Sequence, residues 1–204
     1  MTSIPILIPD SWNDYELIDT GDGMKLECFG AYIVSRPDPR AVWKPQKSSL
    51  VWSTAHAQYI RSTKTEGHWQ IKSPPLPLWL IGYRDMVFRL EPTAFKHIGI
   101  FPEQAVNWVW LQNIVRKQPL NILNLFAYTG AATVAVARAG ARVTHLDSVK
   151  SAITWAHENA RLNAVNGEKI RWIEDDAMKF VLREAKRGNM YDGIILDPPR
   201  FGRG

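Results

Sequence analysis

The chain has 204 residues, is 46% hydrophobic and 22% charged, and carries a formal net charge of +5, which describes an ordinary globular protein with room for one large or two small domains. Its single cysteine excludes an intrachain disulfide and fits a reducing compartment. Because the sequence has neither a secretory leader pattern nor an apolar run of membrane-spanning length, we expect a cytoplasmic protein with no membrane partner.

The first part of the chain reads as a small β-rich domain, which we place at residues 1–94. Short β-like runs at 15–19, 31–34 and 86–90 are separated by turn sequences such as Gly21-Asp22-Gly23. Tryptophans in this stretch could stack on nucleic-acid bases or fill the core of a small β domain, and the sequence leaves both open. They are Trp12, Trp43, Trp52, Trp69 and Trp79.

A strand, a turn and a helix follow one another from residue 121. Residues 121–126 form a short apolar run bounded by turn formers, which predicts a buried strand. Residues 127–130 then turn into a helix of small residues over 131–138. Gly130 can adopt backbone angles that other residues avoid, and the amides at a helix start favour anionic groups.

The next predicted strand, residues 141–146, ends at Asp147. An acid at this position, about 20 residues past the glycine turn, is where a doubly wound fold places a ribose-binding carboxylate. An Asp before a helix is also a common cap, so a purely structural role is the alternative.

Two more units continue the alternation of strands and helices. A helix over 148–163 leads to a strand over 170–174, which ends in Asp175-Asp176-Ala177, and a helix over 178–186 leads to a strand over 191–196. This order predicts a parallel sheet. Asp176 could contact a ligand or cap the helix that follows it.

The last strand runs directly into Asp197, Pro198 and Pro199. Prolines stiffen the loop, and in an open α/β sheet the carboxyl ends of the strands are where ligands bind. We therefore expect this tripeptide to belong to the functional site.

Five sequence stretches together resemble the large-subunit ribosomal RNA methyltransferase I type of S-adenosylmethionine enzyme. The resemblance is good over residues 95–204 and looser over 12–91. It implies a Rossmann-like class I methyltransferase sheet over 95–204, preceded by the small β-rich domain. The stretches are His97 to Gln104, Leu123 to Gly130, His145-Leu146-Asp147, Asp175-Asp176-Ala177 and Leu196 to Gly204.

The resemblance also implies a role for each matching position, with S-adenosyl-L-methionine as the cofactor. Phe126 to Gly130 would line its methionine side, Asp147 would accept from the ribose hydroxyls, and Asp176 with the backbone of Ala177 would contact the adenine. Gln104 would touch the cofactor from the far side, and Asp197 to Pro199 would lie beside the sulfonium and the base. The full expected set for cofactor binding is Gln104, Asn124, Phe126, Tyr128, Thr129, Gly130, Asp147, Ser148, Asp176, Ala177 and Asp197, with Asp197, Pro198 and Pro199 as the catalytic group.

The sequence departs from other methyltransferases at the residue after the two prolines. Enzymes that methylate exocyclic amino groups need an aromatic there, whereas this chain has Arg200, with Phe201 one position later. Carbon methylation of cytosine would need a cysteine nucleophile from a later strand, and the only cysteine is Cys28.

Complete sheets of the family that the sequence resembles have seven strands, so we expect this sheet to be truncated after its fourth strand.

The leading hypothesis is a methyltransferase acting on a base in ribosomal RNA. Residues 96–204 carry 15 basic and 10 acidic residues, against 10 of each in residues 1–95. The excess of basic residues suits an anionic substrate, although solvated helix faces explain it equally well.

One alternative function is that of a non-catalytic RNA- or protein-binding module with the same fold. A nicotinamide oxidoreductase is disfavoured because the first turn has one glycine where the dinucleotide fingerprint has three. The histidines have no metal-ligand spacing, so we expect no metal site.

Overall fold

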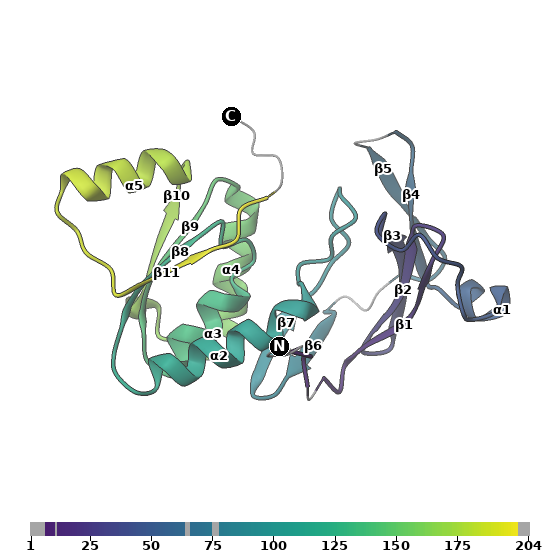
Figure 1. Ribbon diagram of the computed structural model, residues 1–204, viewed down its shortest axis with the longest axis horizontal. Helices are drawn as coiled ribbons and strands as arrows, with labels where there is room; N and C mark the ends of the chain where they lie inside the picture. Colours follow the sequence, from purple (N-terminus) through teal and green to yellow (C-terminus); the bar gives the residue numbers. More distant parts are fainter. Residues whose placement is uncertain (1–6, 11, 64–65, 75–77, 200–204) are drawn as a thin grey trace, which may run out of the picture. The chain divides into compact units, whose positions relative to one another are not determined.

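The computed structural model describes residues 7–10, 12–63, 66–74 and 78–199. The chain divides into two compact units, one formed by Asp10–Pro102 and the other by residues 103–199 together with the described residues 7–9 (Figure 1). In the residues that are described, no helix combines the length and the apolar character needed to cross a membrane.

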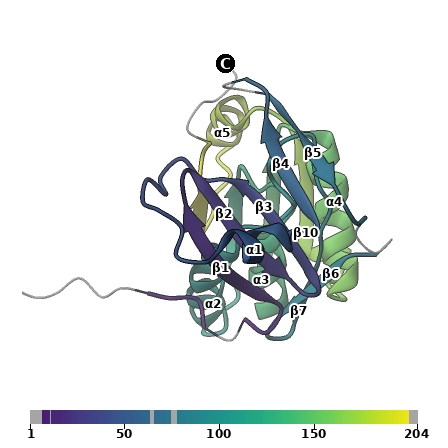
Figure 2. The same cartoon turned by 90° about the vertical axis from the view of Figure 1, so that its right-hand side faces the viewer.

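The unit formed by Asp10–Pro102 is built almost entirely from strands. Five strands form one sheet in the order β1-β2-β3-β4-β5, which Figure 2 shows side by side, and a separate hairpin joins β6 to β7. All neighbours are antiparallel except β3 and β4, whose parallel pairing is reached through a crossover that carries helix α1. The elements are β1 (Tyr15–Gly21), β2 (Met24–Phe29), β3 (Tyr32–Pro37), α1 (Ser49–Ser53), β4 (Ala57–Arg61), β5 (Gly67–Ile71), β6 (Leu80–Tyr83) and β7 (Met86–Arg89).

The tryptophans of this unit serve its packing. Trp79 is buried and donates its indole N–H to the carbonyl of Phe29, and Trp52 donates to the carboxylate of Asp19. The indoles of Trp12, Trp43 and Trp69 likewise donate to backbone carbonyls, those of Pro102, Thr20 and Thr93. These contacts favour the structural alternative over base stacking for Trp79, which is buried, and for the half-buried Trp12, Trp52 and Trp69, whereas Trp43 is 53% exposed.

The second unit carries an α/β sheet. Four parallel strands lie in the order β10-β9-β8-β11, and helices connect them along the chain (Figure 1). The predicted alternation of strands and helices is confirmed, with element ends within about two residues of those expected. The elements are a short 3-10 turn η1 (Pro102–Gln104), α2 (Ala105–Val115), β8 (Asn121–Leu125), α3 (Ala131–Ala139), β9 (Arg142–Asp147), α4 (Lys150–Leu162), η2 (Gly167–Lys169), β10 (Ile170–Glu174), α5 (Ala177–Lys186) and β11 (Gly193–Leu196).

Side chains alternate between the two faces of this sheet. Leu123, Leu125 and Leu146 form one buried cluster with Phe180 of α5, so α5 covers that face. Asn124 and His145, which alternate with them, point to the opposite face, where both lie within reach of Thr133 on α3. The sheet is thus covered by α5 on one side and by α3 on the other.

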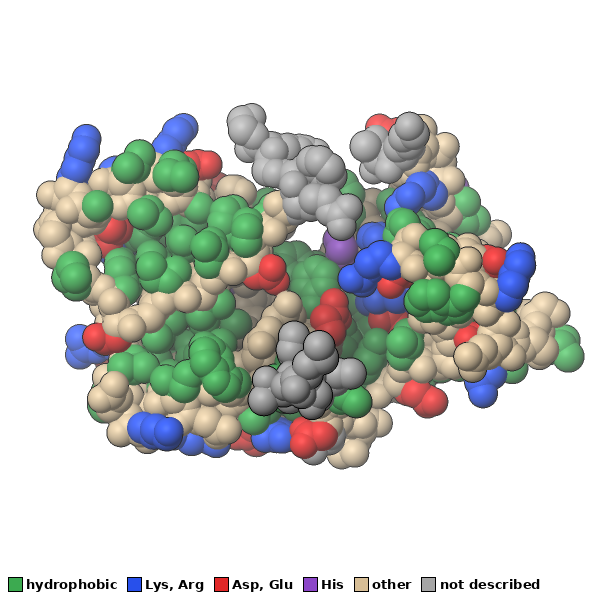
Figure 3. All heavy atoms as spheres, in the orientation of Figure 1, with side chains coloured by type: hydrophobic (Ala, Val, Ile, Leu, Met, Phe, Trp, Pro, Cys, Tyr) green, Lys and Arg blue, Asp and Glu red, His purple; other side chains and the backbone are tan. Residues whose placement is uncertain are grey.

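Strand β11 extends the α5-covered face without being covered itself. In register, Ile194 lies beside Leu123 and Leu196 beside Leu125, yet the two β11 side chains are 61% and 60% exposed. Figure 3 shows hydrophobic side chains over this part of the unit. Within the described residues, β11 pairs only with β8 and is an edge strand with apolar side chains.

Glu184 anchors the end of α5 at the amino end of the sheet. Its buried carboxylate accepts from the hydroxyl of Tyr191 (2.6 Å), the amide of Asn189 (2.9 Å), and Arg187 (3.1 Å) and Arg171 (3.2 Å). The bond from Tyr191 contributes most to lowering the pKa of Glu184, to about 2. The carboxylate therefore ties α5 to β10 and to the segment that enters β11.

We expect Glu184→Gln to lower the free energy of unfolding by about 2 kcal/mol at pH 7, since hydrogen bonds to a charged group are lost. The pKa of Glu184 is lower in the folded chain than in the unfolded one, so its stabilisation is complete above about pH 4.5 and is lost as the pH falls toward 2. Urea titrations of both proteins from pH 7 to pH 3 should show the difference shrinking with pH. The exposed Glu168→Gln variant is the control, and an equal loss there would contradict this role for Glu184.

Candidate functional site

The turn after β8 has an unusual backbone. Phe126, Tyr128 and Gly130 all have positive φ angles, of 55°, 50° and 83°. This conformation costs conformational free energy for residues other than glycine, which adopt it only where the surrounding structure stabilises it. Two backbone hydrogen bonds help to do so, from the amide of Ala127 to the carbonyl of Leu146 (3.0 Å) and from the amide of Gly130 to the carbonyl of Ala127 (3.0 Å).

Asp147 fastens this turn to the end of β9. One carboxylate oxygen accepts from the amide of Tyr128 (2.8 Å), and the other accepts from the amide of Val149 (2.9 Å). Helix α4 begins at Lys150 with Val149 as its cap residue, so Asp147 is not the cap itself. A carboxylate has about four acceptor positions, so Asp147, which is half-buried, can still accept hydrogen bonds from a ligand.

A buried polar network supports the turn from below. The amide of Asn124 donates to the hydroxyl of Thr133 (2.9 Å), and that hydroxyl lies 2.9 Å from Nδ1 of His145. Burial, and to a lesser extent the charge of His157, lowers the pKa of His145 to about 3, so the ring is neutral near pH 7. The side chain of Asn124 is therefore engaged inside the unit, and its contact with a cofactor stays a prediction.

Helix α4 contributes to the same support. The side-chain amide of Asn159 donates to the carbonyl of Thr129 (2.9 Å), and a Cβ on Gly130 would lie 2.9 Å from Cβ of Ala156. The turn and α4 thus approach each other more closely than a side chain at position 130 would permit. Sequence reasoning missed Thr133 and Asn159, for which the available signal was a polar residue at a position where the pattern expects an apolar one.

Asp176 caps the helix that follows β10. Its side chain accepts a hydrogen bond from the amide of Lys179 (2.9 Å), so Asp176 is the cap residue of α5, as one of the two alternatives from the sequence predicted. Asp175 accepts from the amide of Asp176 (2.8 Å) and pairs with Arg183 of α5. The carboxylate of Asp176 is exposed and keeps acceptor capacity, and contact of Asp176 and Ala177 with adenine stays a prediction.

Asp197 and Gln104 lie together although 93 positions separate them in the chain. Nε2 of Gln104 donates to Oδ2 of Asp197 (3.2 Å), and Oε1 of Gln104 accepts from Asn107 (2.7 Å). The segment before α2 therefore reaches the loop after β11, and Pro198 and Pro199 follow as exposed residues. Arg200 and Phe201, which distinguished the sequence from exocyclic amino methyltransferases, lie outside the described residues.

The predicted site residues gather at one edge of the sheet. The four strands are parallel, and Asp147 is in register with Glu174 as Leu125 is with Leu196, so the loops after all four strands meet at that edge. Gln104 reaches the same edge through Asp197, and Ser148 lies exposed beside Asp147. Among the residues that are described, no group of His, Cys, Asp and Glu is arranged to hold a metal ion.

The chemistry of this edge suits a ligand with hydroxyl groups, amino groups and an apolar part. Asp147 and Asp197 are acceptors for hydroxyl and amine hydrogens, and the first amides of α3 have no partner within their helix. The ring of Phe126 is half-buried and offers apolar surface. These groups fit the ribose and amino groups of S-adenosylmethionine without requiring a charged phosphate.

Comparisons with known proteins point the same way. The profile of the S-adenosylmethionine-dependent methyltransferase family matches residues 46–204. A "SAM Dependent Methyltransferase" from Agrobacterium tumefaciens has a TM-score of 0.90 and 45% sequence identity, over 99% of this chain and 66% of its own. A putative methyltransferase from Streptococcus mutans, at 18% identity and a TM-score of 0.74, shares the fold over 93% of this chain and 53% of its own.

Curated relatives match over a shorter stretch. "Ribosomal RNA large subunit methyltransferase K/L" of Shewanella frigidimarina is 35% identical over 115 residues, which are 56% of this chain and 16% of that protein. The protein of the same name from Syntrophotalea carbinolica is also 35% identical over 115 residues, 56% of this chain and 15% of its own length. This chain therefore spans about one sixth of the length of these relatives.

Proposed function

Because the chain belongs to the family of S-adenosylmethionine-dependent methyltransferases, we propose that the edge formed by the loops after β8, β9, β10 and β11 binds S-adenosylmethionine and that the protein methylates a base in ribosomal RNA. One observation carries this proposal. Asp147, at the end of β9, is joined through the amide of Tyr128 to the left-handed turn after β8. That contact places a carboxylate with spare acceptor capacity at the edge of a parallel sheet where ligands bind.

S-adenosylmethionine, when bound, supplies an electrophilic methyl group, and the residues of the chain have the task of orientation. Asp147 would accept from the ribose hydroxyls. Phe126 would pack against the apolar part of the cofactor, with Tyr128, Thr129 and Gly130 shaping the turn beside it. Asp197, oriented by Gln104, can hold an amine hydrogen of the cofactor or a ring N–H of the base.

The choice of RNA is supported by the names of the curated relatives and by the charge of the chain. A base inside a duplex would have to be flipped out of its stack before the loop of Asp197, Pro198 and Pro199 could contact it. The alternative, a non-catalytic module that keeps the fold, predicts cofactor or RNA binding without methyl transfer. Incorporation of labelled methyl groups into ribosomal RNA separates the two.

We further propose that residues 1–94 and 95–204 act as two domains and that an additional strand covers β11. One of the compact units, Asp10–Pro102, ends near that boundary, although the described residues 7–9 group with the other unit. The exposed side chains of Ile194 and Leu196 on β11 support a further element beside this strand, because an unpaired edge strand with apolar side chains favours aggregation. A cytoplasmic location stays a prediction.

Replacing Asp147 is the sharpest test of the cofactor site. We expect Asp147→Ala to weaken the binding of S-adenosylmethionine and of S-adenosylhomocysteine about 100-fold, which corresponds to about 3 kcal/mol. The loss combines the hydrogen bonds to the ribose with release of the Tyr128 amide. Calorimetric titration measures it, with NAD as a cofactor that should not bind.

Asp192→Ala is the matched control. Asp192 also accepts from a backbone amide at a strand end, that of Asn121 (2.7 Å), but at the amino end of β8. Its replacement should lower stability and leave cofactor affinity within about twofold. Equal weakening by both variants would mean that Asp147 acts through folding, and an absence of binding to the native chain would contradict the proposal.

A further inference from the structure

The β-rich unit has a hollow where strands β3 and β4 separate. The two strands pair only at Val34–Ala57 and Ser35–Gln58, although β3 continues to Pro37 and β4 to Arg61. Beyond the last pair lies a cavity of about 380 Å³. Its walls include Met24, Pro37, Pro39, Tyr59, Ile60 and Arg61.

The walls of the hollow are mostly apolar, with Gln58 and Arg61 as polar residues among them. Proline, methionine and isoleucine side chains form much of its wall, and the buried ring of Tyr59 lies among them. The guanidinium of Arg61 belongs to an exposed side chain of the same wall. A volume above about 300 Å³ with apolar walls and few polar groups is typical of sites that take a small flat ligand or part of a larger one.

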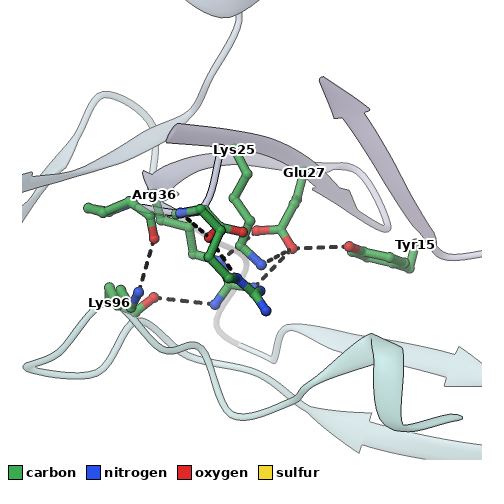
Figure 4. A network of polar contacts seen from close by, with 8 residues as sticks. Tyr15, Lys25, Glu27, Arg36 and Lys96 are labelled. Carbon is green, nitrogen blue, oxygen red and sulfur yellow. Dashed lines mark hydrogen bonds and ion pairs between the residues drawn. The ribbon is translucent and has the colours of Figure 1, made fainter. Parts of the chain in front are cut away.

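Basic side chains cluster next to the residues that line this hollow. Arg36 donates to both oxygens of Glu27 (2.6 and 3.0 Å), and one of these oxygens also accepts from Lys25 (2.9 Å) and Tyr15 (3.1 Å), as Figure 4 shows. Glu27 is fully buried and has no capacity left for further cations. The charges of the other cations are therefore not neutralised by it.

Lys96 and Arg61 are two such cations. The amine of Lys96 donates to the carbonyl of Pro37, a residue of the hollow's wall (3.0 Å), and the carbonyl of Lys96 accepts from Arg36 (3.3 Å). Burial and then the nearby charge of Arg61 lower the pKa of Lys96. Across the residues that the structure covers, Arg61 forms no ion pair with an acid.

The local charge balance is positive. The other acid nearby, Asp38, is bound by Arg40 (3.3 Å). Figure 3 shows Lys and Arg side chains close together on the visible face of this unit, and Phe95, next to Lys96 in the chain, is an aromatic side chain that is 57% exposed. An anion placed at Arg61 and Lys96 would relieve the repulsion between them.

We propose that the β-rich unit binds single-stranded RNA at this surface, with an unpaired base in the hollow between β3 and β4 and the adjoining phosphate at Arg61 and Lys96. The inference rests on the proposed function, in which the substrate is RNA, and adds a second contact site away from the methyl donor. A hollow with apolar walls takes a base only after that base has left its pair, so single strands and loops are the expected ligands. The phosphate contacts supply affinity.

The test is fluorescence anisotropy of a labelled single-stranded oligoribonucleotide with the 204-residue chain at two salt concentrations. We expect Arg61→Ala to weaken binding about five- to tenfold and to reduce the slope of log affinity against log salt by about one. Lys44→Ala is the matched control, since Lys44 is a cation of the same unit that is 88% exposed and pairs with Asp22. Its replacement should change affinity less than twofold. Equal effects of the two variants, or no binding to the native chain, would overturn the proposal.

A second pair of ligands tests the hollow. The native chain should bind the oligonucleotide several-fold more tightly than an abasic strand of the same length, and Ile60→Asp should abolish that preference. Equal binding of both strands, or of a duplex, by the native chain would overturn the assignment of a base to the hollow.

If S-adenosylmethionine binds and Arg61→Ala leaves RNA binding unchanged, this inference alone fails. If RNA binding depends on Arg61 and no S-adenosylmethionine binds, the proposed function alone fails.

Discussion

A Gly130→Ala variant is expected to unfold with a free energy about 3 kcal/mol below that of the native protein and to lose measurable affinity for S-adenosylmethionine. Two costs add up. A non-glycine residue at a φ of 83° costs about 1–2 kcal/mol, and the new Cβ would stand 2.9 Å from Cβ of Ala156, which forces the turn and α4 apart. Since the turn holds the amide of Tyr128 against Asp147, its displacement also disturbs the cofactor site.

Gly188→Ala separates these two costs. Gly188 has a similar φ of 70°, but nothing lies within 4 Å of the Cβ that it would gain. We expect this variant to lose only about 1 kcal/mol and to keep its cofactor affinity. Urea denaturation and calorimetry of both variants provide the comparison. An equal loss of stability in the two would contradict the importance of the close approach to Ala156.

A Glu27→Gln variant is expected to lose about 3–5 kcal/mol of stability. Glu27 is fully buried and Arg36 is 3% exposed, so neutralising the acid leaves a buried guanidinium without its counter-charge. Replacing both residues, as in Glu27→Leu with Arg36→Met, should recover most of the loss, because the buried guanidinium is removed together with its counter-charge and the remaining cation, Lys25, is 20% exposed. Denaturant unfolding of the two proteins measures the difference, and a double variant as unstable as the single one would contradict this reasoning.

The same pair predicts a pH dependence. Burial alone would raise the pKa of Glu27, but the charge and hydrogen bonds of Arg36, with the charge of Lys25, outweigh it and lower the pKa. A carboxyl group whose pKa is lower in the folded state stabilises the protein above its unfolded pKa and loses that contribution as the pH falls. The stability gap between the native protein and Glu27→Gln should therefore narrow in acid.

The sequence predicted the α/β sheet well because its strands read as short apolar runs between turns, whether buried like β8 or exposed at the sheet edge like β11. The runs over 121–126 and 191–196 became β8 and β11 for this reason. Strand β2 was missed, since Lys25 and Glu27 interrupt its apolar residues, and the burial of Glu27 depends on Arg36 from a neighbouring strand. Tertiary pairing of charges is invisible to a local pattern.

The candidate site was predictable in part for a similar reason. The place of Asp147 follows from strand order, so the sequence predicts a carboxylate at that edge. Its hydrogen bond to Tyr128 depends on a left-handed backbone at a non-glycine residue, which no propensity favours. The buried positions of Asn124 and His145 were equally hidden, because the partner of both side chains, Thr133, comes from α3.

The most direct test of the central claim is a nuclear magnetic resonance titration of the ¹⁵N-labelled chain with S-adenosylhomocysteine. The amides of Tyr128 and Val149, which donate to Asp147, should shift saturably, whereas the amide of Asn121, which donates to Asp192 at the opposite end of the sheet, should not. This pattern would place the ligand at the carboxyl ends of β8 and β9. Saturation without shifts at Tyr128 and Val149, or with shifts centred on Asn121, would contradict the account.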